Sequence, residues 1–368
     1  MRLHARLRSS RRAAVGLLAT SAFLACAGSD GGSDSGAATA GRRSGSADLT
    51  GAGATFPYPL YSKWFSDYAA RTGVRINYQS IGSGGGVRQI SEGTVDFGAS
   101  DAPMSDEEMA RAKGGPIVHV PTVIGAVAVT YNLPDVTAPV RLTGEALADI
   151  FRGRITRWND ARIAAVNPGA TLPNRDILVV HRSDGSGTTY VFTDYLTSVS
   201  QAWAAGPGKG KDVQWPTGLG GKGNEGVAGQ VKQTPGSIGY VELAYAKQNR
   251  LPVAEIRNAE GRFVAPSIES ATAAAAGMAG SLPADTDFRV SIVNPRGTNA
   301  YPIASLTWLL VYQNQTDSTK GRKLVDFIRW ALTEGEKTAA ALDYAPLPAA
   351  IVTRLNARVA QIKVGAGA

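Results

Sequence analysis

The chain has 368 residues, of which 43% are hydrophobic and 18% charged, so it is long enough for two domains with substantial cores and too apolar for a disordered protein. Its formal net charge is +8, but five arginines precede Cys26, and 8 − 5 leaves +3 for the remainder. After Cys26 there is no cluster of Lys and Arg with interleaved aromatics, so the sequence gives no support to nucleic acid as a partner.

The N-terminal segment has the layout of an export signal. Several arginines without any acidic residue precede an apolar run, which is too short to form a stable transmembrane helix. The run ends AFLAC, which is similar to the lipobox of bacterial lipoproteins except that Phe23 replaces the usual aliphatic residue. We expect residues 1–25 to be a signal peptide and 26–47 to be a lipidated Cys26 with a flexible Gly/Ser-rich tether. The alternative is that Cys26 belongs to a discarded signal peptide and the protein is periplasmic.

From Leu49 onward, short apolar runs alternate with helical patterns, which is typical of an α/β protein with mainly parallel sheets. The apolar stretch 117–133 is longer than a usual strand, which predicts that it crosses between two lobes. A buried strand is expected at 301–312, and helices with one apolar face are expected around 324–332 and 351–362. These terminal elements are expected to pack on the first lobe.

Three segments share one design, in which a glycine-containing turn with small hydroxyl residues immediately precedes a helical pattern. They are GAGATFPYP at 51–59, IGSGGGV at 81–87 and RSDGSGT at 182–188. A helix start offers unpaired N–H groups and the positive end of a dipole, and glycine lets a ligand approach the backbone. Each turn alone is typical of an ordinary loop, but three of them, one with an arginine, favour a shared anion site.

Nucleotide-binding motifs fail on spacing. A P-loop ending at Lys222 needs glycine at 216, where Pro216 stands, and Ser or Thr at 223, where Gly223 stands. A Rossmann fingerprint starting at Gly82 needs its third glycine at 87, where Val87 stands.

Catalytic motifs fail as well. Ser186 lacks the G-x-S-x-G glycines, because Asp184 and Thr188 flank it at two residues. The two histidines after the signal, His119 and His181, lie in strand-like runs and are expected to be structural. No His, Cys and carboxylate cluster has metal-ligand spacing, so neither a metal nor a cofactor is expected.

Asp101 ends the apolar run VDFGASD and has two interpretations. It is either a turn or helix cap, or it faces the same cleft as Arg182. In the second case an ionised carboxylate, which can only accept hydrogen bonds, would accept a hydrogen bond from hydrogen phosphate and disfavour fully ionised sulfate.

Several motifs together carry a resemblance to a known family. The chain resembles the PstS family, the phosphate-binding proteins of ABC-type phosphate importers, from about Leu49 to the C-terminal helix. The motifs are GAGATFPYPLYSKWF, YQSIGSGGGVRQI, VDFGASDAPMSDEE, PTVIGAVAV, RSDGSGTTYVFTDYL, WPTGLGGKGNEGVAG, GSIGYVELAYAKQN and LDYAPLP.

The resemblance implies a phosphate ion held between two lobes without a metal. Asp101 would accept a phosphate proton, Arg182 would be the charged donor, and Asp184 would orient Arg182. The remaining implied phosphate-binding residues donate from hydroxyl or backbone groups: Thr55, Phe56, Ser83, Ser186, Gly187 and Thr188. His181 departs from the basic residue expected there, and Lys209, Lys211 and Lys222 are expected to be solvated loop charges.

The fold implied is α/β, with the type II, Venus-flytrap architecture of periplasmic binding proteins and two hinge crossings. Residues 48–122 and 302–368 would form lobe I, and 123–301 lobe II. The implied partners are inorganic phosphate and the transmembrane permease subunits of the ABC phosphate importer. We expect a monomer that is not an enzyme, held by its lipid at the outer face of the cell membrane.

Two alternatives remain open at this point. One is a receptor for another oxyanion, such as sulfate or molybdate, and Asp101 discriminates it because those ligands have no proton to donate. The other is a secreted phosphatase using Ser186 or Thr188 as nucleophile, which an ester hydrolysis assay would detect.

Overall fold

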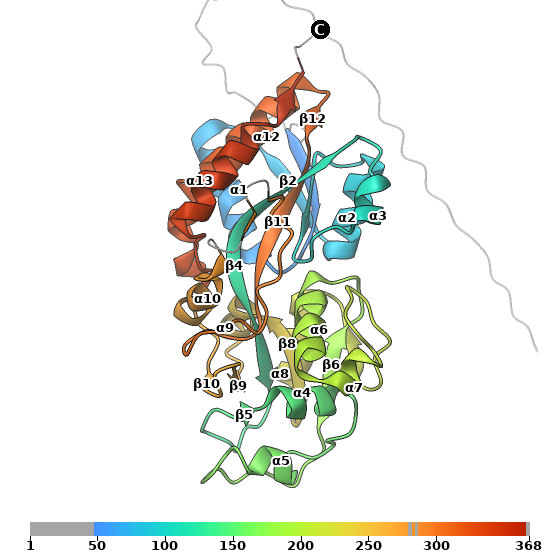
Figure 1. Ribbon diagram of the computed structural model, residues 1–368, viewed down its shortest axis with the longest axis vertical. Coiled ribbons are helices and arrows are strands. Elements are labelled where there is room, and N and C mark those ends of the chain that lie inside the picture. The colour runs from blue at the N-terminus through green and yellow to red at the C-terminus, as the bar shows by residue number, and fades with distance from the viewer. Residues whose placement is uncertain (1–47, 279–281, 284–285, 366–368) are drawn as a thin grey trace, which may run out of the picture. The chain divides into compact units, whose positions relative to one another are not determined.

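The computed structural model describes residues 48–278, 282–283 and 286–365, all within one compact unit, Ser46–Ala368. The predicted signal peptide, Cys26 and the tether lie outside the described residues. The alternation of strands and helices predicted from the sequence is confirmed, and the protein is a mixed α/β fold with two lobes (Figure 1).

One eight-stranded sheet runs through both lobes in the order β2-β1-β3-β11-β4-β8-β6-β7. Strand β4 (Ile117–Tyr131) is the long strand expected from the apolar stretch, and it is buried along its whole length. Its first part, to Ala126, pairs with β11 (Ala304–Tyr312), while Val127–Tyr131 pairs with β8 (Ser237–Glu242). The chain therefore passes between the lobes within β4. The lobe boundaries given above, at 122/123 and 301/302, stay a prediction.

The first lobe combines the N-terminal elements with the C-terminal ones, as predicted. Helices α12 and α13 lie on one side of its sheet, and α2 and α3 on the other (Figure 1). Besides β11 and part of β4, its elements are β1 (Leu49–Gly53), α1 (Tyr58–Thr72), β2 (Ile76–Ser80), α2 (Ser83–Glu92), β3 (Phe97–Ser100), α3 (Asp106–Ala110), β12 (Asn314–Gln315), α12 (Ser318–Ala331), the 3₁₀ turns η1 (Gly335–Thr338) and η2 (Ala340–Leu342), α13 (Ala349–Val359) and β13 (Lys363–Val364).

The second lobe is built around the parallel strands β8, β6 and β7, with a small three-stranded sheet β10-β9-β5 beside them. Besides β8, its elements are β5 (Arg141–Leu142), α4 (Gly144–Phe151), α5 (Ala161–Ala164), β6 (Leu178–Arg182), α6 (Gly187–Val199), α7 (Gln201–Ala204), β7 (Leu219–Gly221), α8 (Gly223–Gln233), α9 (Leu243–Gln248), β9 (Glu255–Arg257), β10 (Phe263–Val264) and α10 (Ile268–Ala275).

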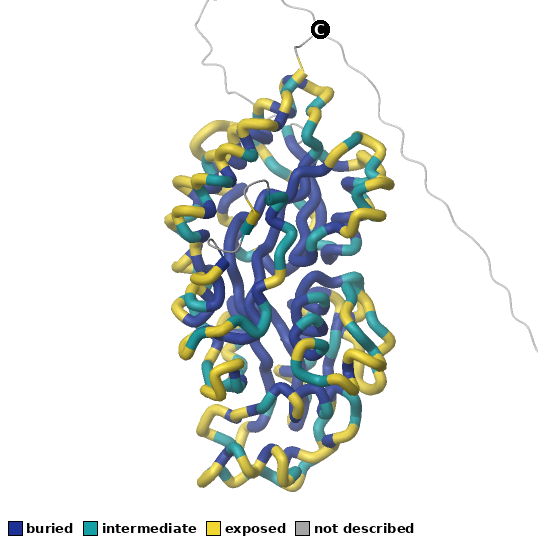
Figure 2. The backbone as a smooth tube through the Cα atoms, in the orientation of Figure 1, coloured by how far each residue is buried: buried dark blue, intermediate teal, exposed yellow. Residues whose placement is uncertain are grey.

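Burial follows the sequence periodicity. The apolar residues expected on one face of α12, among them Leu324, Phe327 and Ile328, are buried, and so are Ile351 and Leu355 of α13. Figure 2 shows the central strands buried and exposed residues on the outer helices and loops. Because the strands of each lobe are packed into a buried core, the loops at the strand ends between the lobes start from well-packed elements.

Candidate functional site

The site lies where the predicted glycine turns meet between the lobes. The turn before α1 contributes Thr55, and the turn before α2 contributes Gly82 and Ser83. From the second lobe, the loop between β6 and α6 faces them. The backbone N–H of Gly84 donates to the carbonyl of Gly185 at 2.8 Å, so the two loops are in direct contact across the lobes.

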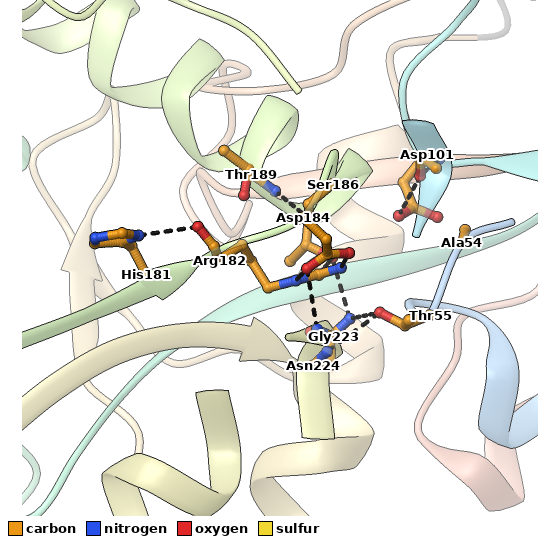
Figure 3. A network of polar contacts seen from close by, with 12 residues as sticks. Ala54, Thr55, Asp101, His181, Arg182, Asp184, Ser186, Thr189, Gly223 and Asn224 are labelled. Atoms are coloured by element: carbon orange, nitrogen blue, oxygen red, sulfur yellow. Dashed lines mark hydrogen bonds and ion pairs between the residues drawn. The ribbon is translucent and has the colours of Figure 1, made fainter. Parts of the chain in front are cut away.

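Arg182 ends β6 and is buried with 3% exposure. Its guanidinium donates to both carboxylate oxygens of Asp184, from Nε to Oδ1 at 2.8 Å and from Nη2 to Oδ2 at 2.6 Å (Figure 3). Burial raises the pKa of Asp184 and is the largest single influence, but the hydrogen bonds and charge of Arg182, together with backbone N–H donors such as that of Gly223, outweigh it and lower that pKa. The predicted orienting role of Asp184 therefore has the geometry it needs, because a two-point pair fixes the plane of the guanidinium.

Asp101 follows β3 in the first lobe and is also buried, with 1% exposure. Its Oδ1 accepts a hydrogen bond from the hydroxyl of Thr307 at 2.8 Å, and Ser83 lies 3.4 Å from its Oδ2. Burial raises the pKa of Asp101 to about 7, although the Thr307 hydrogen bond and the positive charge of Arg182 both lower it. Asp101 is therefore a carboxyl group that can exchange a proton near neutral pH.

The start of α6 points at this carboxyl group. Ser186 caps the helix, since its Oγ accepts from the N–H of Thr189 at 3.0 Å. Gly187 and Thr188 occupy the first helical positions, whose N–H groups have no partner within the helix. A Cβ added at Gly187 would lie 2.5 Å from both Ser83 Oγ and Asp101 Oδ2, so only glycine lets the helix start approach these side chains.

Thr55 and Phe56 lie before α1 and are both buried. The carbonyl of Thr55 accepts from the hydroxyl of Tyr245 at 2.6 Å, and that of Phe56 accepts from the hydroxyl of Tyr344 at 2.7 Å. The Thr55 hydroxyl points to Asn224 at the start of α8, whose Nδ2 lies 2.7 Å away (Figure 3).

The structure thus brings most of the predicted binding residues together, and Phe56 and Ser186 lie beside them as chain neighbours of Thr55 and Gly187. The first lobe contributes Thr55, Phe56, Ser83 and Asp101, and the second contributes Arg182, Asp184, Ser186, Gly187 and Thr188. His181 points away from the group, since its Nδ1 lies 2.9 Å from its neighbour's carbonyl and its ring stacks on Trp215. His119 is buried in β4 and accepts from the N–H of Met104, which is the structural role expected of it.

Sequence reasoning missed two residues of this site, Asn224 and Thr307. Asn224 stands in KGNEG, a fourth glycine-containing turn before a helix, and this pattern could have identified it. Thr307 lies inside the buried strand β11, where its side chain faces Asp101 only because β3 and β11 are neighbours in the sheet. The sequence around Thr307 carries no signal for that contact.

The prediction for the loop lysines was wrong for Lys211. Lys211 forms an ion pair with Glu108 of α3, so it joins the two lobes, and Lys209 pairs with Asp194. The side chain of Lys211 is only 20% exposed, whereas that of Lys209 is 39% exposed and keeps the solvated character expected of it.

The described residues contain no group of three or more His, Cys, Asp or Glu side chains placed to hold a metal ion. Among the same residues, no helix combines the length and apolar character needed to cross a bilayer.

Sequence comparisons agree with the geometry. The family model of the PBP superfamily domain matches residues 36–334. A phosphate-binding protein PstS from Pasteurella multocida is 47% identical over 311 residues, covering 84% of this chain and 89% of that protein. Another PstS, from Methanocaldococcus jannaschii, is 41% identical and covers 77% of this chain and 78% of that protein.

Solved structures share the fold. A high-affinity periplasmic phosphate-binding protein, crystallised with phosphate, superposes with a TM-score of 0.67 at 22% identity, covering 86% of this chain and 96% of that one. A phosphate-binding protein from Stenotrophomonas maltophilia gives a TM-score of 0.65 at 21% identity, with coverage of 85% and 94%. The two-lobed binding-protein architecture expected from the sequence is confirmed by these matches.

Proposed function

The chain belongs to the PstS family of phosphate-binding proteins within the PBP superfamily, and from this premise we propose how its site holds the ion. The protein captures inorganic phosphate between its two lobes for an ABC-type phosphate importer. The observation that carries the proposed site is the opposition of Arg182 and Asp101, a fixed cation and a carboxyl group that exchanges a proton near neutral pH.

We assign the donors to the oxygens of phosphate that carry no proton. The guanidinium of Arg182 supplies charge, and the N–H groups of Gly187 and Thr188 supply the positive end of the α6 dipole. Hydroxyls and backbone N–H groups of Thr55, Phe56, Ser83, Ser186 and Thr188 complete the set. Asp101 accepts a hydrogen bond from the protonated oxygen of hydrogen phosphate, which sulfate and molybdate lack, so those oxyanions are disfavoured.

Binding is reversible and proceeds without turnover in this proposal. A phosphatase would need a base beside Ser186 or Thr188, but the Ser186 hydroxyl oxygen caps α6 and neither described histidine contacts these hydroxyls. The hydroxyls therefore serve as hydrogen-bond donors and not as nucleophiles.

Closure of the two lobes by a hinge motion where the chain crosses between them, within β4 and just before β11, would enclose the ion. Several contacts join the two lobes in the structure, including the Gly84–Gly185 backbone hydrogen bond and the Lys211–Glu108 ion pair, and an opening motion would break them. The permease subunits would recognise the closed form, in which the rims of both lobes are brought into one surface.

We further propose that the protein is a monomer, tethered to the outer face of the cell membrane by a lipid on Cys26. The support is the AFLAC ending of the signal-like segment, followed by residues with little to bury. Mass spectrometry of the membrane fraction would detect the lipid, and Cys26→Ser would release the protein into the soluble fraction if the anchor is real.

Calorimetry of residues 46–368, refolded to remove bound ligand, tests the binding function. Phosphate should bind saturably at one site, sulfate should compete weakly at neutral pH, and a phosphate monoester should be neither bound tightly nor hydrolysed. Equal affinity for sulfate and phosphate would overturn the role of Asp101, and ester hydrolysis would overturn the assignment as a pure binding protein.

A further inference from the structure

Asn224 is the only described side chain that donates hydrogen bonds to threonines of both lobes. It is fully buried at the start of α8. Its Nδ2 donates to Thr55 Oγ1 at 2.7 Å in the first lobe and to Thr188 Oγ1 at 3.2 Å in the second. Both threonines belong to the proposed phosphate site, so Asn224 connects two proposed phosphate donors by bonding their hydroxyl oxygens.

At Thr55, the hydrogen bonds from Asn224 leave the hydroxyl able to form only one more hydrogen bond, as a donor. A threonine hydroxyl has one O–H donor and two lone pairs. Thr55 Oγ1 accepts from the side chain of Asn224 and also from its backbone N–H at 3.2 Å. With both lone pairs occupied, the Thr55 hydroxyl can only donate its hydrogen to a further partner.

The same condition holds at Thr188. Its Oγ1 accepts from Asn224 Nδ2 and lies 3.4 Å from Nη1 of Arg182, which is also a donor. The Thr188 hydroxyl is therefore left to donate as well. A ligand oxygen that carries a proton would face two hydroxyl donors here and would find no acceptor for its own hydrogen.

The amide of Asn224 cannot reverse its orientation without loss. Its Oδ1 accepts from the backbone N–H of Glu242 at 2.8 Å, and a flipped amide would bring NH₂ against that N–H and leave both donors without an acceptor. Because β8 holds Glu242 in place, the backbone of the second lobe determines which way Asn224 donates.

We propose that Asn224 is a positioning residue that forces Thr55 and Thr188 to act as hydrogen-bond donors, so that this end of the site accepts only unprotonated phosphate oxygens. The proton of hydrogen phosphate is then directed to Asp101 at the other end. This inference rests on the proposed function, since it assigns the orientation of the same ion.

A double-mutant cycle tests this coupling. Phosphate affinity is measured by calorimetry for residues 46–368 in four forms: the unchanged protein, Asn224→Leu, Thr55→Val with Thr188→Val, and all three changes together. In the threonine background, Asn224→Leu should lower affinity about tenfold, the scale of losing one oriented hydrogen bond to a charged group. In the valine background, the same change should alter affinity less than about twofold, since there are no hydroxyls left to orient.

Asn132→Leu is the matched control, because Asn132 also lies in the second lobe and its Nδ2 donates only to backbone carbonyls. This change should lower the melting temperature and leave phosphate affinity unchanged. If Asn224→Leu does not fold, Asn224→Ala replaces it in the cycle.

The outcomes separate the two proposals. Failure of the unchanged protein to bind phosphate would refute the proposed function. Normal binding combined with an equal effect of Asn224→Leu in both backgrounds would leave the function intact and refute the positioning role.

Discussion

Two carboxylates lie within this site, and their surroundings give them opposite properties. Asp184, in the second lobe, receives two hydrogen bonds from Arg182 and a third from the N–H of Gly223 at 3.0 Å. Asp101, in the first lobe, is bonded mainly to the hydroxyl of Thr307 and is more deeply buried. The pKa of Asp184 is lowered, whereas the pKa of Asp101 is raised to about 7.

The difference shows that burial by itself does not determine the charge of an acid. Burial raises the pKa of both carboxyl groups, and the outcome depends on whether a cation is bonded directly to the oxygens. Asp184 stays ionised and orients Arg182 as a fixed cation. Asp101 faces the same cation without a direct bond, so it remains free to share a proton with a ligand.

The largest change to this arrangement would come from Arg182→Ala. It removes the charged donor and leaves Asp184 as an unpaired, mostly buried carboxylate, a loss of about 3–5 kcal/mol for a broken buried pair. We expect phosphate affinity to fall at least a hundredfold by calorimetry, with a lower melting temperature.

Arg152→Ala is the control for that change, because Arg152 pairs with Asp149 in α4, within the second lobe. It should leave phosphate affinity unchanged. A small effect of Arg182→Ala on affinity would place the anion elsewhere.

Sulfate binding should depend on pH through Asp101. Below pH 7 the Asp101 carboxyl group is protonated and can donate to sulfate, whereas above pH 7 it is ionised and repels an ion that brings no proton. We expect sulfate affinity to rise about tenfold or more between pH 8 and pH 5, since one hydrogen bond to a charged group is gained. Isothermal titration with sulfate at several pH values measures this directly.

Two variants sharpen the assignment. Asp101→Asn, which can donate at every pH, should bind sulfate better at pH 8 and lose the pH dependence. Asp184→Asn should keep the pH dependence, because the lowered pKa of Asp184 puts its titration below this range. A pH dependence that survives Asp101→Asn would assign the proton to another group.

The same raised pKa has a consequence for the ligand-free fold. Between the ordinary pKa of 3.8 and about 7, the folded state holds a proton on Asp101 that the unfolded chain has released. The contribution of Asp101 to the free energy of unfolding therefore falls as pH rises through this window and is constant above it.

The sequence predicts the second-lobe side of this comparison better than the first. Arg182, Asp184, Ser186 and Thr188 lie within one short segment from the end of β6 to the start of α6, so local turn and helix chemistry brings them together. Glycine spacing also identified the turns before α1 and α2. The alternation of strands and helices and the long strand β4 could be predicted for the same reason, because they follow from local sequence patterns.

The environment of Asp101 could not be read in this way. It depends on Thr307, 206 residues away, and on the antiparallel pairing of β11 with β3. The role of Asn224 and the ion pair of Lys211 likewise arise only when the lobes meet. Contacts between distant segments determine whether a carboxylate is paired, and one sequence does not specify them.

The smallest expected effects concern the rims of the lobes, where ion pairs connect them, among them Lys211–Glu108 and Lys247–Asp343. Lys211 and Glu108 are mostly buried, with side-chain exposures of 20% and 28%, whereas Lys247, paired with Asp343, is 52% exposed. Lys211→Met should raise the rate of phosphate release about threefold, and Lys247→Met less than about twofold, because exposed pairs contribute about 0.2–1 kcal/mol. Stopped-flow tryptophan fluorescence during dissociation would measure both rates. Lys63→Met breaks a pair confined to α1 and should leave release unchanged, so an equal acceleration in that variant would show that the rim pairs do not hold the lobes closed.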